Sequence, residues 1–188
     1  PRPKWQRREL PALAGLTLAT AAVSFCYLGS MTAPQNPLDA TGTVLTVDVV
    51  PQQEVSGVWL YPGISDGGSV RITDDAGAVL LEQPLSYSTC FCWTNHDLTA
   101  AAGEVLHITV ENAQLFEVSL RSGAGAAAVS GGGAAFDEPN AVPTKINQLN
   151  SMYFDEIYHA RTGYEQLHAL RVYETTHPPL GKDCIMLG

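Results

Sequence analysis

The feature that most constrains this chain is an uncharged run near its start, LPALAGLTLATAAVSFCYL at residues 10–28. An α-helix rises about 1.5 Å per residue, so the run would extend about 28 Å, close to the thickness of a bilayer's hydrocarbon core. Residues 1–9 contain four basic side chains and one acidic side chain, a bias that predicts a cytoplasmic N-terminus. The sequence therefore predicts a cytoplasmic basic segment at residues 1–9 and a transmembrane helix at residues 10–30.

Three other interpretations compete for this run. A cleaved signal peptide has a shorter apolar core followed by small residues, and the alanine-rich composition with Met31-Thr32-Ala33 is compatible with one. A buried helix of a globular domain and an amphipathic transit peptide are disfavoured, because the run has no polar face. A membrane span and a cleaved signal both place the following residues outside the cytoplasm. The expected location is therefore the cell membrane, with the later segments extracytoplasmic.

Residues 40–121 alternate short apolar runs with turn residues, a pattern typical of β structure. Apolar and polar residues alternate within 43–50 and 104–111, so one face of each strand is expected to be buried. The spacing predicts an antiparallel β-sandwich of jelly-roll-like form. The predicted strands are residues 43–50, 56–62, 69–73, 78–83, 87–93, 104–111 and 115–121, with turns at 66–68, 74–77 and 111–113.

Charge excludes one class of partner. The chain has 10 Lys and Arg against 19 Asp and Glu, a formal net charge of −9, whereas nucleic-acid binding needs basic surfaces.

The aromatic residues of the β segment indicate a carbohydrate ligand, because an exposed ring in a sandwich can stack on a sugar. Trp59 and Trp93 are the candidates for sugar stacking, and the competing interpretation is that both fill the core.

Cys90, Cys92 and His96 raise the question of a metal site. Their spacing is not a standard zinc-finger spacing and a fourth ligand is missing, so two half-buried cysteines and no metal are expected. Four cysteines are also too few for a disulfide scaffold. Residues 122–150 are rich in Gly and Ala, which predicts a flexible linker between the β module and the final segment.

Residues 151–188 predict an amphipathic loop helix. Ser151 is the expected N-cap, and apolar residues then recur at helical spacing until the helix ends near Leu170. His177-Pro178-Pro179 predicts an extended turn, because neither proline can continue a helix. The apolar residues 184–188 are typical of the start of a second, truncated transmembrane helix. Because the chain also begins with Pro, it is expected to be a piece of a longer protein.

The segment contains two motifs, Tyr153-Phe154-Asp155-Glu156 and His177-Pro178-Pro179-Leu180-Gly181-Lys182. Through these motifs and the leading apolar run the chain resembles the protein O-mannosyltransferase family, polytopic GT-C-type glycosyltransferases that use dolichyl- or polyprenyl-phosphate mannose. In that family an Asp-Glu pair after an aromatic residue, and then a His-Pro-Pro-Leu-x-Lys segment, lie in the first extracytoplasmic loop. Residues 40–150 depart from the family pattern, because in the family this loop follows the first span almost directly.

The resemblance implies inverting transfer of mannose, or a related sugar, from a polyprenyl-phosphate donor to a protein Ser/Thr or another hydroxyl acceptor. A hydroxyl is a poor nucleophile until a base accepts its proton, and Asp155 is the candidate base, with Glu156 orienting the acceptor or the loop. His177 and Lys182 are candidates for placing the loop against the lipid phosphate. The implied partners are the membrane bilayer, the lipid-linked donor and a protein or glycan acceptor, with no metal and no further cofactor.

Residues 1–188 alone are expected to be inactive, because a site for a lipid-linked sugar needs several spans. The alternative function is a membrane-anchored carbohydrate-binding β-sandwich without catalysis. A third interpretation makes the β domain a spacer or an assembly surface.

Overall fold

The computed structural model describes residues 9–24, 32–123, 125–148 and 150–187. The chain divides into two compact units, residues 1–31 and residues 32–188. In the first unit, α1 (Glu9–Ser24) is a helix of 16 residues. Residues 1–8 of the expected basic segment 1–9 and residues 25–30 of the expected span 10–30 lie outside the described residues.

The predicted membrane spans are corrected by the structure. Among the described residues, no helix combines the length and the apolar character needed to cross a bilayer. The 16 residues of α1 extend about 24 Å, whereas a span needs about 20 predominantly apolar residues. The expected second span corresponds to α3 (Pro179–Leu187), which has nine residues, includes Lys182 and Asp183, and packs against another helix, α2 (Asp155–Leu167).

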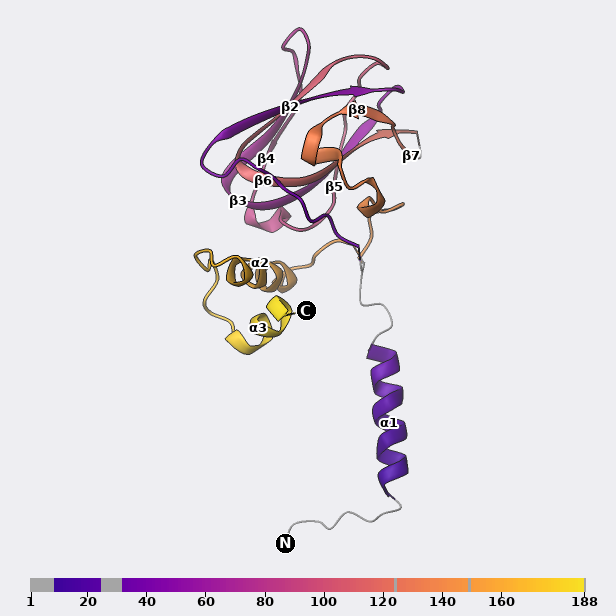
Figure 1. The fold of residues 1–188 in the computed structure, drawn as a ribbon, viewed down its shortest axis with the longest axis vertical. Helices are drawn as coiled ribbons and strands as arrows, with labels where there is room; N and C mark the ends of the chain where they lie inside the picture. Colours follow the sequence, from indigo (N-terminus) through magenta and orange to yellow (C-terminus); the bar gives the residue numbers. More distant parts are fainter. Residues whose placement is uncertain (1–8, 25–31, 124, 149, 188) are drawn as a thin grey trace. The chain divides into compact units, whose positions relative to one another are not determined.

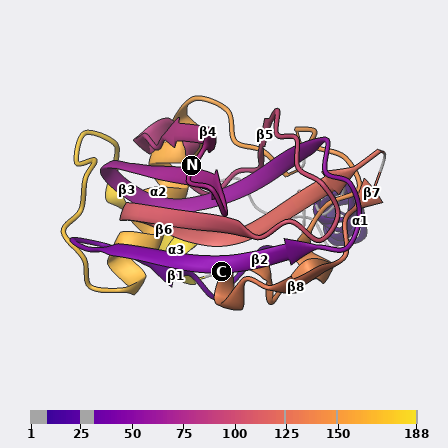
Figure 2. The ribbon, with the colours of Figure 1, turned by 90° about the horizontal axis from the view of Figure 1, so that it is seen from above.

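The second unit contains one antiparallel sheet of eight strands (Figures 1 and 2). Its main path runs β4-β3-β6-β2-β8, and β1 and β7 pair with β6 while β5 pairs with β3. The strands are β1 (Leu38–Asp39), β2 (Val44–Pro51), β3 (Gly57–Asp74), β4 (Val79–Pro84), β5 (Thr94–His96), β6 (Leu106–Ser122), β7 (Gly125–Ala126) and β8 (Val129–Gly131).

The prediction of a two-sheet, jelly-roll-like sandwich is wrong, because two expected turns are bulges inside long strands. Strands predicted at 56–62 and 69–73 are both parts of β3, and those at 104–111 and 115–121 are both parts of β6. β3 and β6 pair from Gly57↔Arg121 to Asp74↔Leu106, with register shifts between them. A Cβ on Gly68 would lie 2.3 Å from the carbonyl oxygen of Glu111. The glycine therefore permits close backbone approach where the sequence suggested a reversal.

The core lies along these strands and follows their alternation. Leu106, Ile108 and Val110 are fully buried, whereas His107 on the opposite face is partly exposed. The strand predicted at 87–93 is absent from the described structure, where η1 (Tyr87–Thr89), a 3₁₀ turn, occupies that place.

The Gly/Ala-rich segment 122–150 also differs from the predicted flexible linker. It contains β7, β8 and two 3₁₀ turns, η2 (Gly133–Phe136) and η3 (Pro139–Ala141). Ala127 and Ala135 belong to the hydrophobic core. Gly131 adopts φ +87°, and a Cβ there would lie 2.6 Å from the carbonyl oxygen of Asp48. Small residues here permit close packing on the sheet rather than free movement.

The helices α2 and α3 lie side by side next to the sheet (Figure 1). Gly163 permits a close approach of the two helices, because a Cβ on it would lie 3.0 Å from Cγ2 of Ile185. α2 begins later than predicted: Phe154 occupies the N-cap position, while the Ser151 hydroxyl donates to the carbonyl oxygen of Asn147 at 2.8 Å.

Candidate functional site

The start of α2 presents an exposed carboxylate and two exposed aromatic rings. Tyr153 and Phe154 are 82% and 69% exposed, and Asp155 follows them as the first helical residue. Glu156 Oε2 accepts the backbone N–H of Tyr153 at 2.9 Å, so this carboxylate is occupied by the backbone just before α2. Within the part of the chain that the structure describes, no hydrogen bond or ion pair occupies the Asp155 carboxylate. Asp155 is thus the member of the pair that is open to a ligand.

Glu174 organises the segment that carries His177 and Lys182. Its carboxylate binds the Lys182 ammonium, and the Lys182 Nζ also donates to the Glu174 carbonyl oxygen at 2.9 Å. The same carboxylate accepts the Thr176 hydroxyl and lies 3.0 Å from Nδ1 of His177. The hydrogen bond from Lys182 holds the pKa of Glu174 well below its usual range. Lys182 is only 2% exposed, and its contacts with Glu174 hold the loop before α3 against that helix.

His177 lies against the first turns of α2. Its ring centroid is 5.1 Å from that of His159 and 6.3 Å from that of Tyr158, on which it stacks. Tyr158 and His159 come one turn after Asp155 along the helix. The structure therefore places His177 close to the end of α2 that Asp155 begins, although the two motifs are far apart in the sequence. Lys182 contributes to this arrangement indirectly, through Glu174.

Two groups that the sequence did not single out hold α2 in place. Arg161 is buried, and it donates from Nε to Glu165 at 2.7 Å and from Nη2 to Asp66 at 3.0 Å. Glu165 in turn accepts the backbone N–H of Tyr173 at 2.7 Å. The only signal for these contacts in the sequence is the i,i+4 spacing of Arg161 and Glu165, which is common on exposed helix faces.

The two tryptophans predicted to stack on a sugar are covered by neighbouring side chains. Trp93 is 4% exposed and packs on Tyr61 with ring centroids 5.2 Å apart. The Arg121 guanidinium lies 3.9 Å from the centre of the Trp59 ring. These placements favour the core-filling interpretation for Trp93 and a cation–π contact for Trp59.

Cys90 and Cys92 are buried and reduced, and each thiol donates to a carbonyl oxygen three residues earlier. Burial raises the pKa of both thiols, which makes them poor nucleophiles and poor metal ligands. The side chain of His96 contacts the Thr94 hydroxyl at 2.9 Å.

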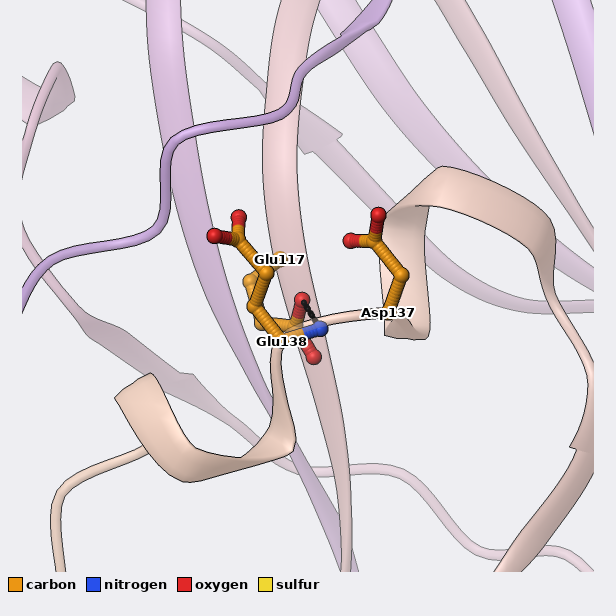
Figure 3. Close-up of side chains that lie close together, drawn as sticks. All are labelled: Glu117, Asp137 and Glu138. Carbon is orange, nitrogen blue, oxygen red and sulfur yellow. Dashed lines mark hydrogen bonds between the residues drawn. The ribbon is translucent and has the colours of Figure 1, made fainter.

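A second group of titratable side chains lies on β6 and after η2 (Figure 3). Ligand atoms of Glu117, Asp137 and Glu138 lie within 4.8 Å of one another. Glu117 is 1% exposed and accepts the backbone N–H of Glu138 at 3.1 Å, while Glu138 accepts the backbone N–H groups of Gln35 and Asn36. These bonds give the carboxyl groups of Glu117 and Glu138 a structural role, because they hold separate chain segments together.

The chain has no significant match to a protein-family model, to a curated protein or to a solved structure.

Proposed function

We propose that this chain is part of a glycosyltransferase that transfers mannose, or a related sugar, from a polyprenyl-phosphate donor to a hydroxyl acceptor with inversion. The observation that carries the proposal is the contact of His177 with Tyr158 and His159, one turn after Asp155. It gathers the Asp-Glu motif and the His-Pro-Pro motif at one end of one helix, as a shared site requires.

Asp155 serves the acceptor. Its carboxylate is exposed at the start of α2, and Glu156 is occupied by the backbone of Tyr153. In the proposed reaction the acceptor oxygen attacks the anomeric carbon, and its proton passes to Asp155. The bond between the anomeric carbon and the phosphate oxygen breaks, and its electron pair leaves with the polyprenyl phosphate, so no strong acid is needed.

His177 serves the donor. Nδ1 lies 3.0 Å from a Glu174 carboxylate oxygen, and in the imidazolium form of the ring the Nε2–H on the opposite side would donate to a phosphate oxygen. Lys182 acts as a positioning residue, because its ammonium is buried against Glu174. The donor's lipid would bring this site to a membrane surface, and extracytoplasmic location stays a prediction.

The test is a transfer assay with the complete gene product, lipid-linked mannose and a hydroxyl acceptor. Asp155→Asn is expected to lower the rate by about 100-fold or more, the usual contribution of a positioned base. Protein stability should change by only about 0.3–1 kcal/mol, because the first-turn carboxylate interacts mainly with the helix dipole. Asp97→Asn, an exposed acid outside the site, is the matched control. Equal rates for Asp155→Asn and Asp97→Asn would remove Asp155 from the reaction.

A further inference from the structure

A cavity of about 930 Å³ lies between the sheet and the helices α2 and α3. β1 and β6 supply Asp39, Gln114 and Phe116, α2 supplies Tyr164, and the C-cap of α2 supplies His168. Its volume and its mixture of apolar wall and few polar groups are typical of a site for a small molecule. The cavity is separate from Asp155 and His177, which do not line it.

One wall of the cavity is aromatic. Phe91, Phe116 and Tyr164 contact one another, with ring centroids 5.0 to 6.2 Å apart. Phe91 adopts φ +55°, and its N–H donates to the carbonyl oxygen of Pro62 at 2.7 Å, which fixes its loop against β3. A Cβ on Gly63 would lie 2.5 Å from Phe116, so the glycine leaves the room that this ring occupies. The wall is thus built from three separate chain segments and held by packing.

The polar edge consists of an amide and a carboxylate. Gln114 Nε2 donates to Asp39 Oδ2 at 3.1 Å, and Gln114 Oε1 accepts the backbone N–H of Ile64 at 3.4 Å. Asp39 Oδ1 accepts the backbone N–H of Thr41 at 2.9 Å. Burial acts to raise the pKa of Asp39, but the hydrogen bonds from Thr41 and Gln114 outweigh it and hold that pKa below its usual value. Asp39 is therefore an ionised acceptor beside the aromatic wall, and its carboxylate can still accept one further hydrogen bond.

Charge narrows the ligand class. Of the described residues that line the cavity, none is Lys or Arg, and Asp39 is the only carboxylate. A phosphate or carboxylate ligand would meet the Asp39 anion with no Lys or Arg among the described lining residues to balance the charge. A polyol instead offers a hydroxyl to Asp39, and its C–H face suits aromatic rings.

We propose that this cavity binds an uncharged mono- or disaccharide, with a pyranose face against Tyr164 and Phe91 and a hydroxyl donated to Asp39. The binding site does not depend on the transfer reaction proposed above, because it uses neither Asp155 nor His177. It also differs from the sugar site that the sequence suggested at Trp59 and Trp93.

The test is a titration of the isotope-labelled full chain with mannose, glucose and mannobiose, followed by NMR. At least one of these sugars is expected to bind and to shift the signals of Gln114 and His168. Asp39→Asn and Tyr164→Leu should each weaken binding by about tenfold or more, the usual effect of losing a charged hydrogen bond or an aromatic contact. Asp97→Asn is the matched control and should bind as the unmodified chain does.

His168→Ala provides a second variant that should fold, because His168 is exposed and does not support the core. Its ring centroid lies 4.1 Å from that of Tyr164, so the change still alters the wall of the cavity. Mannose 1-phosphate and choline test the charge argument, and both should bind more weakly than the preferred neutral sugar. The proposal is overturned if no neutral sugar binds, if either charged probe binds more tightly, or if affinity is unchanged in the cavity variants that fold. The titration contains no lipid-linked donor and uses neither Asp155 nor His177. Failure of a neutral sugar to bind therefore leaves the transferase proposal intact, and failure of the transfer assay leaves the cavity proposal intact.

Discussion

Glu117 is a carboxyl group in the interior of the sheet, on β6 opposite Tyr61 of β3. Burial raises its pKa to about 8, and the charges of Asp137 and Glu138 act in the same direction (Figure 3). The single hydrogen bond from the Glu138 backbone N–H, which favours the ionised form, does not compensate for the lost hydration. A neutral carboxyl group is therefore the stable form of this residue in the folded chain at neutral pH.

This shift predicts a pH-dependent stability. The folded pKa of about 8 exceeds the ordinary value of 4.5, so between these pH values the folded chain holds a proton that the unfolded chain releases. The free energy of unfolding should fall as pH rises through this window, by at most about 1.4 kcal/mol per pH unit. Glu117→Gln cannot titrate, yet it keeps an oxygen for the Glu138 N–H, and should flatten this part of the profile. Urea unfolding between pH 5 and pH 8 measures the difference.

The exposed Glu54→Gln is the control, and its profile should follow that of the unmodified protein. His107, whose pKa is raised by its hydrogen bond to Asp48, also loses stabilisation as pH rises, but it does so equally in all three proteins. A Glu117→Gln profile that keeps the full slope would show that Glu117 ionises normally in the folded chain.

At the scale of elements, the sequence predicts which side chains of a strand are buried, but it does not predict what each glycine does. The alternation around Leu106 and Ile108 predicted a strand with one buried face, because side-chain period is a local property. The glycines at 67–68 predicted a turn, but a glycine needed for close strand approach looks the same in a sequence as one needed for a reversal. Which of the two applies depends on β6, which is distant in the chain.

The same limit applies to the candidate site. The Asp155-Glu156 and His177 motifs are visible as local patterns, and the family resemblance predicts that they share one loop but not that His177 contacts α2. Glu174, which links His177 to Lys182, carries no local signal. The Gly/Ala-rich segment was predicted as a linker because composition does not reveal that Ala127 and Ala135 are in the core.

Gly68 provides the prediction at this scale. In Gly68→Ala the new Cβ would meet backbone atoms of Glu111 and Asn112 at 2.3–2.7 Å, so β3 and β6 would have to separate locally. We expect a loss of about 1–3 kcal/mol in the free energy of unfolding, as for other overpacked sites. Gly125→Ala is the control, because nothing lies within 4 Å of its Cβ position and its effect should stay within about 0.5 kcal/mol. Similar urea midpoints for the two variants would contradict the close approach of the strands.

At the scale of the second unit, the proposed reaction depends on how firmly α2 is attached to the sheet. Arg161 reaches Asp66 on β3, and Tyr158 of α2 stacks on Tyr87 of η1 with ring centroids 5.9 Å apart. α3 is joined in turn through Lys182 and Glu174. The position of Asp155 therefore depends on the contacts that attach α2 to the sheet. α2 also forms part of the wall of the proposed sugar cavity.

Arg161→Met tests this attachment. The change leaves Glu165 buried without its partner, and we expect a cost of about 3 kcal/mol, as for other broken buried pairs. Loss of the contact with Asp66 should matter little, since its side chain is 76% exposed. Adding Glu165→Gln removes the orphaned charge, keeps an acceptor for the Tyr173 N–H, and should restore most of the stability. Hydrogen exchange should show faster opening of α2 and α3 in Arg161→Met, with β3 and β6 remaining protected. Equal acceleration in the helices and the strands would instead mean that the sheet and the helices unfold as one unit, with Arg161 contributing only to global stability.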